Sequence, residues 1–215
     1  MSFTAPRTTP IGIAGTTGNI EALLEEPAGQ RVAAFGVICH PHPLGGGTMT
    51  NKVVHALARA MQKFGAPTLR FNFRGVGASA GVFDDGAGET QDALAVIAAG
   101  RERWPGAALW LAGFSFGSFV ALQVCNTARA NKLVTVAPPV GRWDFCAIPA
   151  PQCPWLILQG DADELVDAEA VLAWAAGSPA RPEVHLLNGV GHFFHGRLHD
   201  IDVHAVKFLA QSGDA

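Results

Sequence analysis

The amino-acid sequence predicts an α/β fold, in which a mostly parallel sheet carries helices on both faces. Short, nearly continuous apolar runs such as residues 32–39 are typical of strands that are covered on both sides. These runs alternate with segments of helical period such as residues 50–65, and this alternation is the pattern of a parallel sheet. The length of 215 residues suits one domain over residues 1–215.

Composition excludes several classes of protein. Hydrophobic residues make up 49% of the chain and charged residues only 15%, which excludes intrinsic disorder. The net charge of −3 and the absence of Lys or Arg clusters predict no nucleic acid partner and no anionic membrane partner. The apolar runs are too short to span a bilayer, and residues 1–10 lack the features of a secretory signal, so we expect a cytoplasmic protein.

The elements follow in a regular order after an N-terminal exception. Residues 11–14 and 19–24 predict an antiparallel hairpin at a sheet edge. The later strands are expected at 32–39, 68–73, 107–112, 132–137, 155–158 and 183–187, and the helices at 50–65, 89–103, 115–130, 167–177 and 199–210. Thr50 is expected to cap the first helix, and Gly65 to end it in a left-handed conformation.

The most informative motif is GFSFG at residues 113–117. GxSxG is typical of a nucleophile elbow when a strand precedes it and a helix follows, because the tight turn accepts only small residues on either side of the serine. An apolar strand and a helical segment flank this copy. The context therefore makes Ser115 the candidate nucleophile.

A second copy of the motif, GASAG around Ser79, has no such context. The residues that follow it contain two glycines and two acids and show no helical period, so Ser79 is interpreted as a loop residue. Gly75, Gly77 and Ala80 in the same stretch fit GxGxxA, but a dinucleotide site needs a helix to begin there. No nicotinamide or flavin cofactor is predicted.

A serine nucleophile needs a base and an acid that orients the base, and in α/β folds of this kind they follow the serine in the order acid, histidine. The loop after the 155–158 strand offers four acids. Asp167 is explained as a helix cap and Asp161 as a turn residue, which favours Asp163 and leaves Glu164 as the alternative. His192 lies at the tip of the loop after the last strand and is the candidate general base.

Acyl transfer also needs amide donors aimed at the developing oxyanion. The amide of Phe116, directly after the candidate nucleophile, is one donor. The loop after the first central strand supplies the other, and because Pro41 and Pro43 have no amide hydrogen, the donor is His42, Leu44 or a glycine. We favour Leu44.

Substrate contacts are expected from side chains in these same loops, namely His42, Phe114 and Phe193. The histidines near the C-terminus, including His195 and His199, raise the alternative of a metal site. Zinc spacing such as HExxH is absent, and we interpret these two as solvent-exposed residues with no metal.

Two further features complete the prediction. Residues 138–154 are too few for a large helical lid, which indicates an open, shallow site. The four cysteines show no CxxC spacing and are expected to be reduced and buried.

The chain resembles small bacterial α/β-hydrolases of the dienelactone-hydrolase-like group. The segments that carry this resemblance are ICHPHPLGGGTMTNKVV, RFNFRGVGASAGVFDDGAGE, GFSFGS, QGDADELV and GHFFHG. The resemblance implies a serine carboxylesterase or related acyl hydrolase whose triad is Ser115, Asp163 and His192. Dienelactone hydrolases themselves use cysteine at the position of Ser115, which argues against dienelactone as the substrate.

The functional hypothesis is a serine hydrolase that cleaves carboxylic esters of small or medium acyl substrates through an acyl-enzyme, without a cofactor. A thioesterase or a peptidase would use the same triad. A catalytically silent module that binds a small ligand is the alternative from another class. The sequence predicts no oligomeric state.

Overall fold

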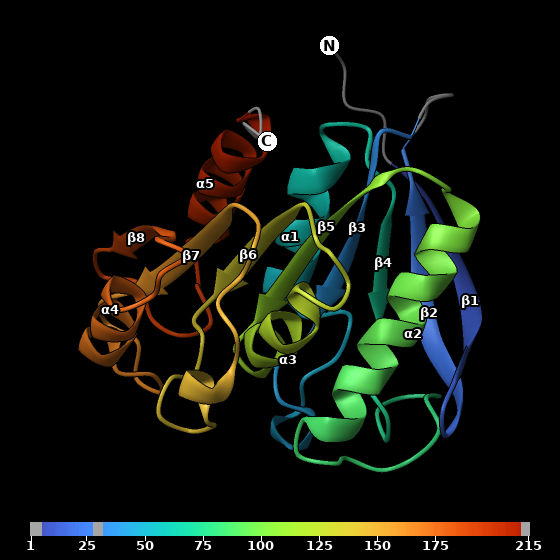
Figure 1. Cartoon of the computed structure of the whole chain (residues 1–215), viewed down its shortest axis with the longest axis horizontal. Helices are drawn as coiled ribbons and strands as arrows, with labels where there is room; N and C mark the ends of the chain where they lie inside the picture. The colour runs from blue at the N-terminus through green and yellow to red at the C-terminus, as the bar shows by residue number, and fades with distance from the viewer. Residues whose placement is uncertain (1–5, 28–31, 212–215) are drawn as a thin grey trace.

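The computed structural model describes residues 6–27 and 32–211, and its sheet has eight strands in the order β1-β2-β4-β3-β5-β6-β7-β8 (Figure 1). The strands are β1 (Arg7–Gly15), β2 (Gly18–Glu26), β3 (Ala34–Cys39), β4 (Thr68–Phe71), β5 (Ala108–Phe114), β6 (Lys132–Val136), β7 (Trp155–Gly160) and β8 (Glu183–Leu187). The helices are α1 (Lys52–Gln62), α2 (Ala87–Arg103), α3 (Phe116–Cys125), α4 (Ala168–Ala176) and α5 (Leu198–Ala210), with short 3₁₀ turns η1 (Pro43–Gly45) and η2 (Phe145–Ala147).

The predicted sheet topology is confirmed. β1 and β2 form an antiparallel hairpin, β2 joins β4 antiparallel, and every pair from β4 to β8 along the sheet is parallel. The hairpin strands are longer than predicted. β1 lies at the sheet edge, where exposed residues alternate with partly buried ones and with the buried Ile13. The first residues of β1 are polar, so the sequence shows no apolar pattern from which the start of the strand could be predicted.

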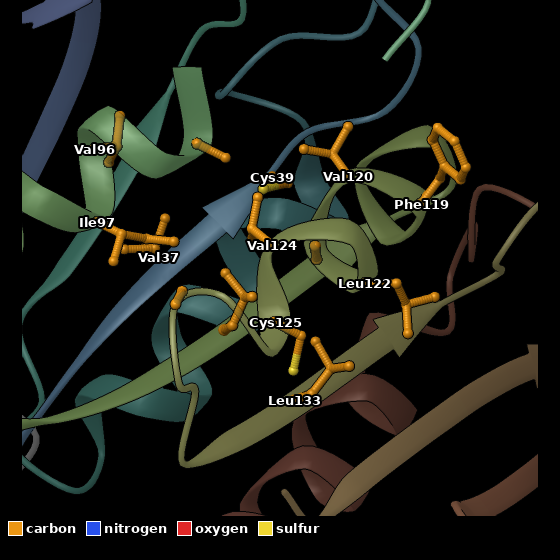
Figure 2. Close-up of a cluster of buried hydrophobic side chains, with 14 of the residues drawn as sticks. Val37, Cys39, Val96, Ile97, Phe119, Val120, Leu122, Val124, Cys125 and Leu133 are labelled. Atoms are coloured by element: carbon orange, nitrogen blue, oxygen red, sulfur yellow. The ribbon is translucent and has the colours of Figure 1, made fainter. Parts of the chain in front are cut away.

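Helices cover both faces of the sheet. α2, α3 and α4 lie in front of it in Figure 1, while α1 and α5 pack on the opposite face. Figure 2 shows how α3 packs on the first of these faces, where Val120 and Val124 lie beside Cys39 of β3. The strands β3 and β7 are buried along their whole length, which explains the apolar runs of β3 and of the first four residues of β7.

The structure corrects the predicted cap at the start of α1. Asn51, and not Thr50, caps α1, because its side-chain oxygen accepts a hydrogen bond from the Val53 amide at 2.8 Å. The Thr50 hydroxyl instead forms a hydrogen bond with the Thr48 hydroxyl at 2.8 Å. Thr50 precedes the capping position by one residue. Gly65 does adopt the expected left-handed conformation, with φ of 75°.

The expectation that all cysteines are buried is wrong for two of them. All four are free, but Cys146, in the short 3₁₀ turn η2, is exposed, and Cys153, in the connection before β7, is half-buried. Cys39 and Cys125 are buried as expected, and the Cys125 sulfur lies 3.7 Å from that of Cys153.

No helix in residues 6–27 and 32–211 is long and apolar enough to cross a membrane. Residues 1–5, on which the interpretation of the N-terminus partly rests, lie outside the described residues.

The loops that follow β3, β5, β7 and β8 meet at the carboxyl edge of the sheet, towards the lower part of Figure 1. In parallel sheets this edge is where functional residues gather.

Candidate active site

Ser115 stands in a strained turn between β5 and α3. Its φ of 53° and ψ of −122° lie outside the regions that L-residues ordinarily adopt. A side chain on Gly113 would come within 2.1 Å of the Gly117 carbonyl oxygen, so this turn requires glycine. The Ser115 amide donates to the Val136 oxygen at 2.8 Å, which ties the turn to β6. The geometry is that of a nucleophile elbow.

The structure brings Ser115, His192 and Asp163 into one hydrogen-bonded chain. His192 Nε2 lies 3.0 Å from Ser115 Oγ, and His192 Nδ1 lies 2.9 Å from Asp163 Oδ2. The Asp163 side chain is fully buried and that of His192 is 3% exposed, whereas Ser115 is partly open to solvent. The serine is therefore accessible while its two partners are shielded from water.

Asp163 is held as a carboxylate by several donors. Burial alone would raise its pKa, but the hydrogen bond from His192 and those from the Leu165 and Val166 amides outweigh burial and lower the pKa. These amides donate to Oδ1 at 2.9 and 2.8 Å. The acid is therefore ionised at neutral pH, as an orienting group for imidazole needs to be.

One side chain near the acid was missed by the sequence analysis, and another has a different role from the one considered. Gln159, the buried penultimate residue of β7, donates from Nε2 to Asp163 Oδ2 at 3.1 Å. Glu164, weighed above as an alternative acid, accepts from the His192 backbone amide at 3.0 Å, and that hydrogen bond lowers its pKa. The only visible signal for Gln159 was a polar residue at the end of an apolar strand.

The backbone amides of the loop after β3 and of Phe116 are the candidate donors to an oxyanion at Ser115. The amides of Gly45, Gly46 and Gly47 already donate to carbonyls within their own loop. Among the described residues no backbone acceptor is found for the amides of His42, Leu44 and Phe116. The glycine amides are therefore engaged within the loop, whereas those of His42 and Leu44 are not.

A buried histidine supports that loop. His40 is fully buried; its Nε2 accepts from the Phe73 amide at 3.0 Å and its Nδ1 donates to the Pro41 oxygen at 2.6 Å. Burial lowers the pKa of His40 to about 4, so the ring is neutral at physiological pH. His40 thereby joins the start of the loop to the chain after β4, a role that the sequence analysis did not assign.

A cavity of about 370 Å³ opens above Ser115 and His192. His42, Leu44 and Phe193 line it, as the sequence analysis expects of substrate contacts and the oxyanion loop. Phe114 does not, which corrects the expectation that it contacts substrate. It is fully buried beneath the His192 ring, with 5.2 Å between ring centroids, because the turn at Ser115 directs it into the core.

The competing motifs have other roles. Ser79 is buried, its hydroxyl donates to the Asn72 oxygen at 2.7 Å, and it accepts from the Glu21 amide at 2.9 Å, which makes it a structural residue. His195 and His199 are exposed. Within residues 6–27 and 32–211, no group of three or more metal-binding side chains could hold an ion.

The fold and the elbow define an α/β serine hydrolase, and comparisons with known proteins agree. An α/β serine hydrolase without a lid from Xanthomonas campestris is 37% identical, with a TM-score of 0.90 over 100% of this chain and 99% of its own. An α/β serine hydrolase homologue from Coxiella burnetii is 42% identical, with a TM-score of 0.91 over 97% and 100%.

The family itself follows from the sequence comparison. The model of the serine aminopeptidase S33 family matches residues 34–152, which is more than half of the chain. An uncharacterized protein of Rickettsia prowazekii is 35% identical over 190 residues, covering 84% of this chain and 79% of that protein. The chain belongs to the serine aminopeptidase S33 family, and the resemblance to small α/β-hydrolases is confirmed.

Proposed function

We propose that the protein is a carboxylesterase for small or medium acyl substrates, with Ser115, His192 and Asp163 as its catalytic triad. The observation that carries this proposal is the continuous hydrogen-bonded chain from Ser115 Oγ through both nitrogens of His192 to Asp163. A serine nucleophile, a base within reach and an orienting acid are the minimal requirements for acyl transfer.

The reaction has two halves. Ser115 Oγ attacks the ester carbonyl while His192 Nε2 takes the serine proton, and that proton then goes to the alkoxide as the carbon–oxygen bond breaks. A water molecule attacks the resulting acyl-enzyme, His192 accepts its proton, and the proton returns to Ser115 Oγ as the acid leaves. Asp163 holds the imidazole in place and stabilises its positive charge in both halves.

The oxyanion of each tetrahedral intermediate needs two donors near the serine. We assign the Phe116 amide and, from the opposite loop, the Leu44 amide. The absence of a backbone acceptor for either amide among the described residues supports this assignment, since such donors are free to turn to a ligand. Loss of one such donor is expected to cost about 10²-fold to 10³-fold in turnover.

The name of the family raises aminopeptidase activity as a second candidate. An aminopeptidase has to bind the protonated amino terminus of its substrate, for which a carboxylate is the strongest partner. The residues that line the cavity include no Asp or Glu. This lack favours an ester substrate over a peptide with a free amino terminus. A thioester would pass through the same intermediates and is a separate arm of the test.

The test combines covalent labelling with turnover. Intact mass is measured after treatment with a fluorophosphonate, which labels activated serines, for the wild type, Ser115→Ala and Ser79→Ala. Hydrolysis of p-nitrophenyl butyrate, a butanoyl thioester and an aminoacyl p-nitroanilide is measured in parallel. We expect one adduct on the wild type and none on Ser115→Ala, with turnover reduced about 10⁴-fold to 10⁶-fold.

The Ser79→Ala variant is the matched control, because it removes the serine of the other GxSxG motif. It should still take one adduct, although loss of its buried hydrogen bonds lowers its stability. A Ser115→Ala variant that keeps full activity, or a wild type that neither labels nor hydrolyses any substrate, would overturn the proposal.

A further inference from the structure

The cavity above the candidate triad has one charged wall. The loop between β6 and β7 contributes Pro139, Arg142 and Trp143 to the same cavity that Ser115 and His192 line. Arg142 is the only residue of that lining with a permanent charge. The other residues of the lining are apolar, glycine or neutral polar residues. In such a cavity an arginine whose charge the protein does not neutralise can select ligands by their charge.

Arg142 has no acidic partner within residues 6–27 and 32–211. In the part of the chain that the structure describes, its side chain makes no ion pair or hydrogen bond, whereas Arg70, Arg74, Arg103 and Arg197 each pair with a carboxylate.

The nearby acids are already engaged. Asp144 accepts from the Cys146 and Ala147 amides at 3.1 Å, and Asp85 accepts from the Trp143 indole at 3.0 Å. The Arg142 guanidinium is therefore available to a ligand.

The loop that carries Arg142 is held in position. The Arg142 amide donates to the Pro139 oxygen at 3.1 Å, and Val140 and Trp143 form an isolated bridge. The Trp143 ring stacks on Phe119, with 5.5 Å between centroids. The fixed turn therefore holds the backbone of Arg142 at this wall of the cavity.

The charge of Arg142 also reaches into the cavity. Burial lowers the pKa of His42, and repulsion from the Arg142 guanidinium adds to this effect, while Asp85 and Glu89 act in the opposite direction. His42 therefore stays neutral at physiological pH, and it adds no second positive charge beside the serine. The cavity therefore presents one permanent positive charge, that of Arg142.

We propose that the ester hydrolysed at Ser115 carries a carboxylate, and that Arg142 binds this group and selects such substrates. The inference rests on the proposed esterase function. It names a substrate class, the half-esters of short dicarboxylic acids or the esters of short hydroxy acids. Pro139, Trp143 and Phe193 line the same cavity and offer apolar surface to the chain between the carboxylate and the ester. Arg142 is a specificity residue and takes no part in proton transfer.

The test compares matched charged and neutral substrates. Monomethyl glutarate and its neutral amide, methyl glutaramate, place the charge on the acyl side; butanoyl glycolate and butanoyl glycolamide place it on the alcohol side. The readout is the ratio of kcat/KM for the charged ester to that for its amide. We expect a ratio of about ten or more for one of the pairs, since hydrogen bonds to charged groups discriminate by about that factor.

Substitution of Arg142 should change this ratio. Arg142→Gln is expected to lower it about ten-fold, chiefly through KM, and Arg142→Glu to invert it. High salt should lower the wild-type ratio, because Arg142 is exposed. Arg7→Gln, at an exposed arginine of the edge strand β1 that forms no ion pair with the described residues, is the matched control and should leave the ratio unchanged.

The outcomes separate the two proposals. A wild type that hydrolyses p-nitrophenyl butyrate but shows no preference in either pair overturns the carboxylate inference alone. An unchanged ratio in Arg142→Gln does the same. A wild type without fluorophosphonate labelling and without turnover of any ester refutes the esterase proposal itself.

Discussion

Gly117, two residues after Ser115, lies where α3 comes closest to β3. A Cβ atom at this position would lie 2.2 Å from the Cys39 oxygen and 2.6 Å from the His40 oxygen. Both atoms belong to the backbone, so no side-chain rotation can relieve the contact. Val120 and Val124, further along α3, pack on the same end of β3 in Figure 2 and keep the helix against the sheet.

The size of the effect of Gly117→Ala follows from these distances. An ordinary carbon–oxygen contact is about 3.3 Å, so the start of α3 has to move by about 1 Å. That movement carries Ser115 and the Phe116 amide with it, and a misplacement of about 1 Å at a reacting group costs about 10²-fold in rate. Overpacking of the helix against the strand lowers the free energy of unfolding by about 1 to 3 kcal/mol.

Gly177→Ala supplies the matched control. Gly177 follows α4, has φ of −79°, and its nearest neighbours to an added Cβ are at 3.6 Å. Alanine there should leave turnover unchanged and raise the free energy of unfolding by about 0.4 to 1 kcal/mol. Urea unfolding, p-nitrophenyl ester turnover and the rate of fluorophosphonate labelling are measured for both variants. A Gly117→Ala protein with wild-type stability and wild-type labelling rate would refute the tight approach of α3 to β3.

Three further predictions concern charged and titrating groups. Asp163→Asn keeps the shape of the acid but loses its charge beside His192, and ester turnover at neutral pH should fall about 10³-fold to 10⁴-fold. Glu25→Gln leaves the buried Arg70, its partner at 2.9 Å, without a counter-charge, and urea unfolding should show a loss of about 3 kcal/mol or more. The pKa of Glu25 is lowered, although burial acts to raise it, so the wild-type advantage over this variant should shrink as the pH falls below about 4.5. His40 has a pKa of about 4 when folded and an ordinary value near 6.5 when unfolded, so the unfolded chain binds the proton more tightly. The wild type should therefore lose about 2 kcal/mol between pH 7 and pH 5 that His40→Gln does not lose, and equal losses in the two proteins would contradict this reasoning.

The order of strands and helices was predictable because the central strands are covered on both faces. Their continuous apolar runs, as in β3 and the first four residues of β7, differ clearly from the helical period of α1. The ends of elements were less predictable. At the start of α1, both Thr50 and Asn51 are good caps, and only the local backbone decides which side chain reaches the first free amide.

The same limit applies to the site. Ser115, Asp163 and His192 each follow a strand, so chain order and topology predict their meeting. Gln159 contacts Asp163 four residues further on, and His40 contacts the Phe73 amide 33 residues further on. A lone polar residue at the end of an apolar run carries no periodic signal that would predict either contact. Phe114 was assigned to the substrate side because it adjoins the serine, but the turn reverses its direction and buries it.

The burial of His192 and Asp163 explains how a hydrolase of this size can work without a lid. In many enzymes a closing lid excludes water and thereby strengthens the electrostatic interactions within the site. Here the His192 ring lies on Phe114 and against Phe193, with centroids 5.2 and 5.1 Å away, so its bond to Asp163 is shielded before any substrate binds. Since shielding is built into the fold, closure is not needed to assemble the site. We therefore expect substrate selection to depend on the fixed walls of the cavity, above all on the charge of Arg142.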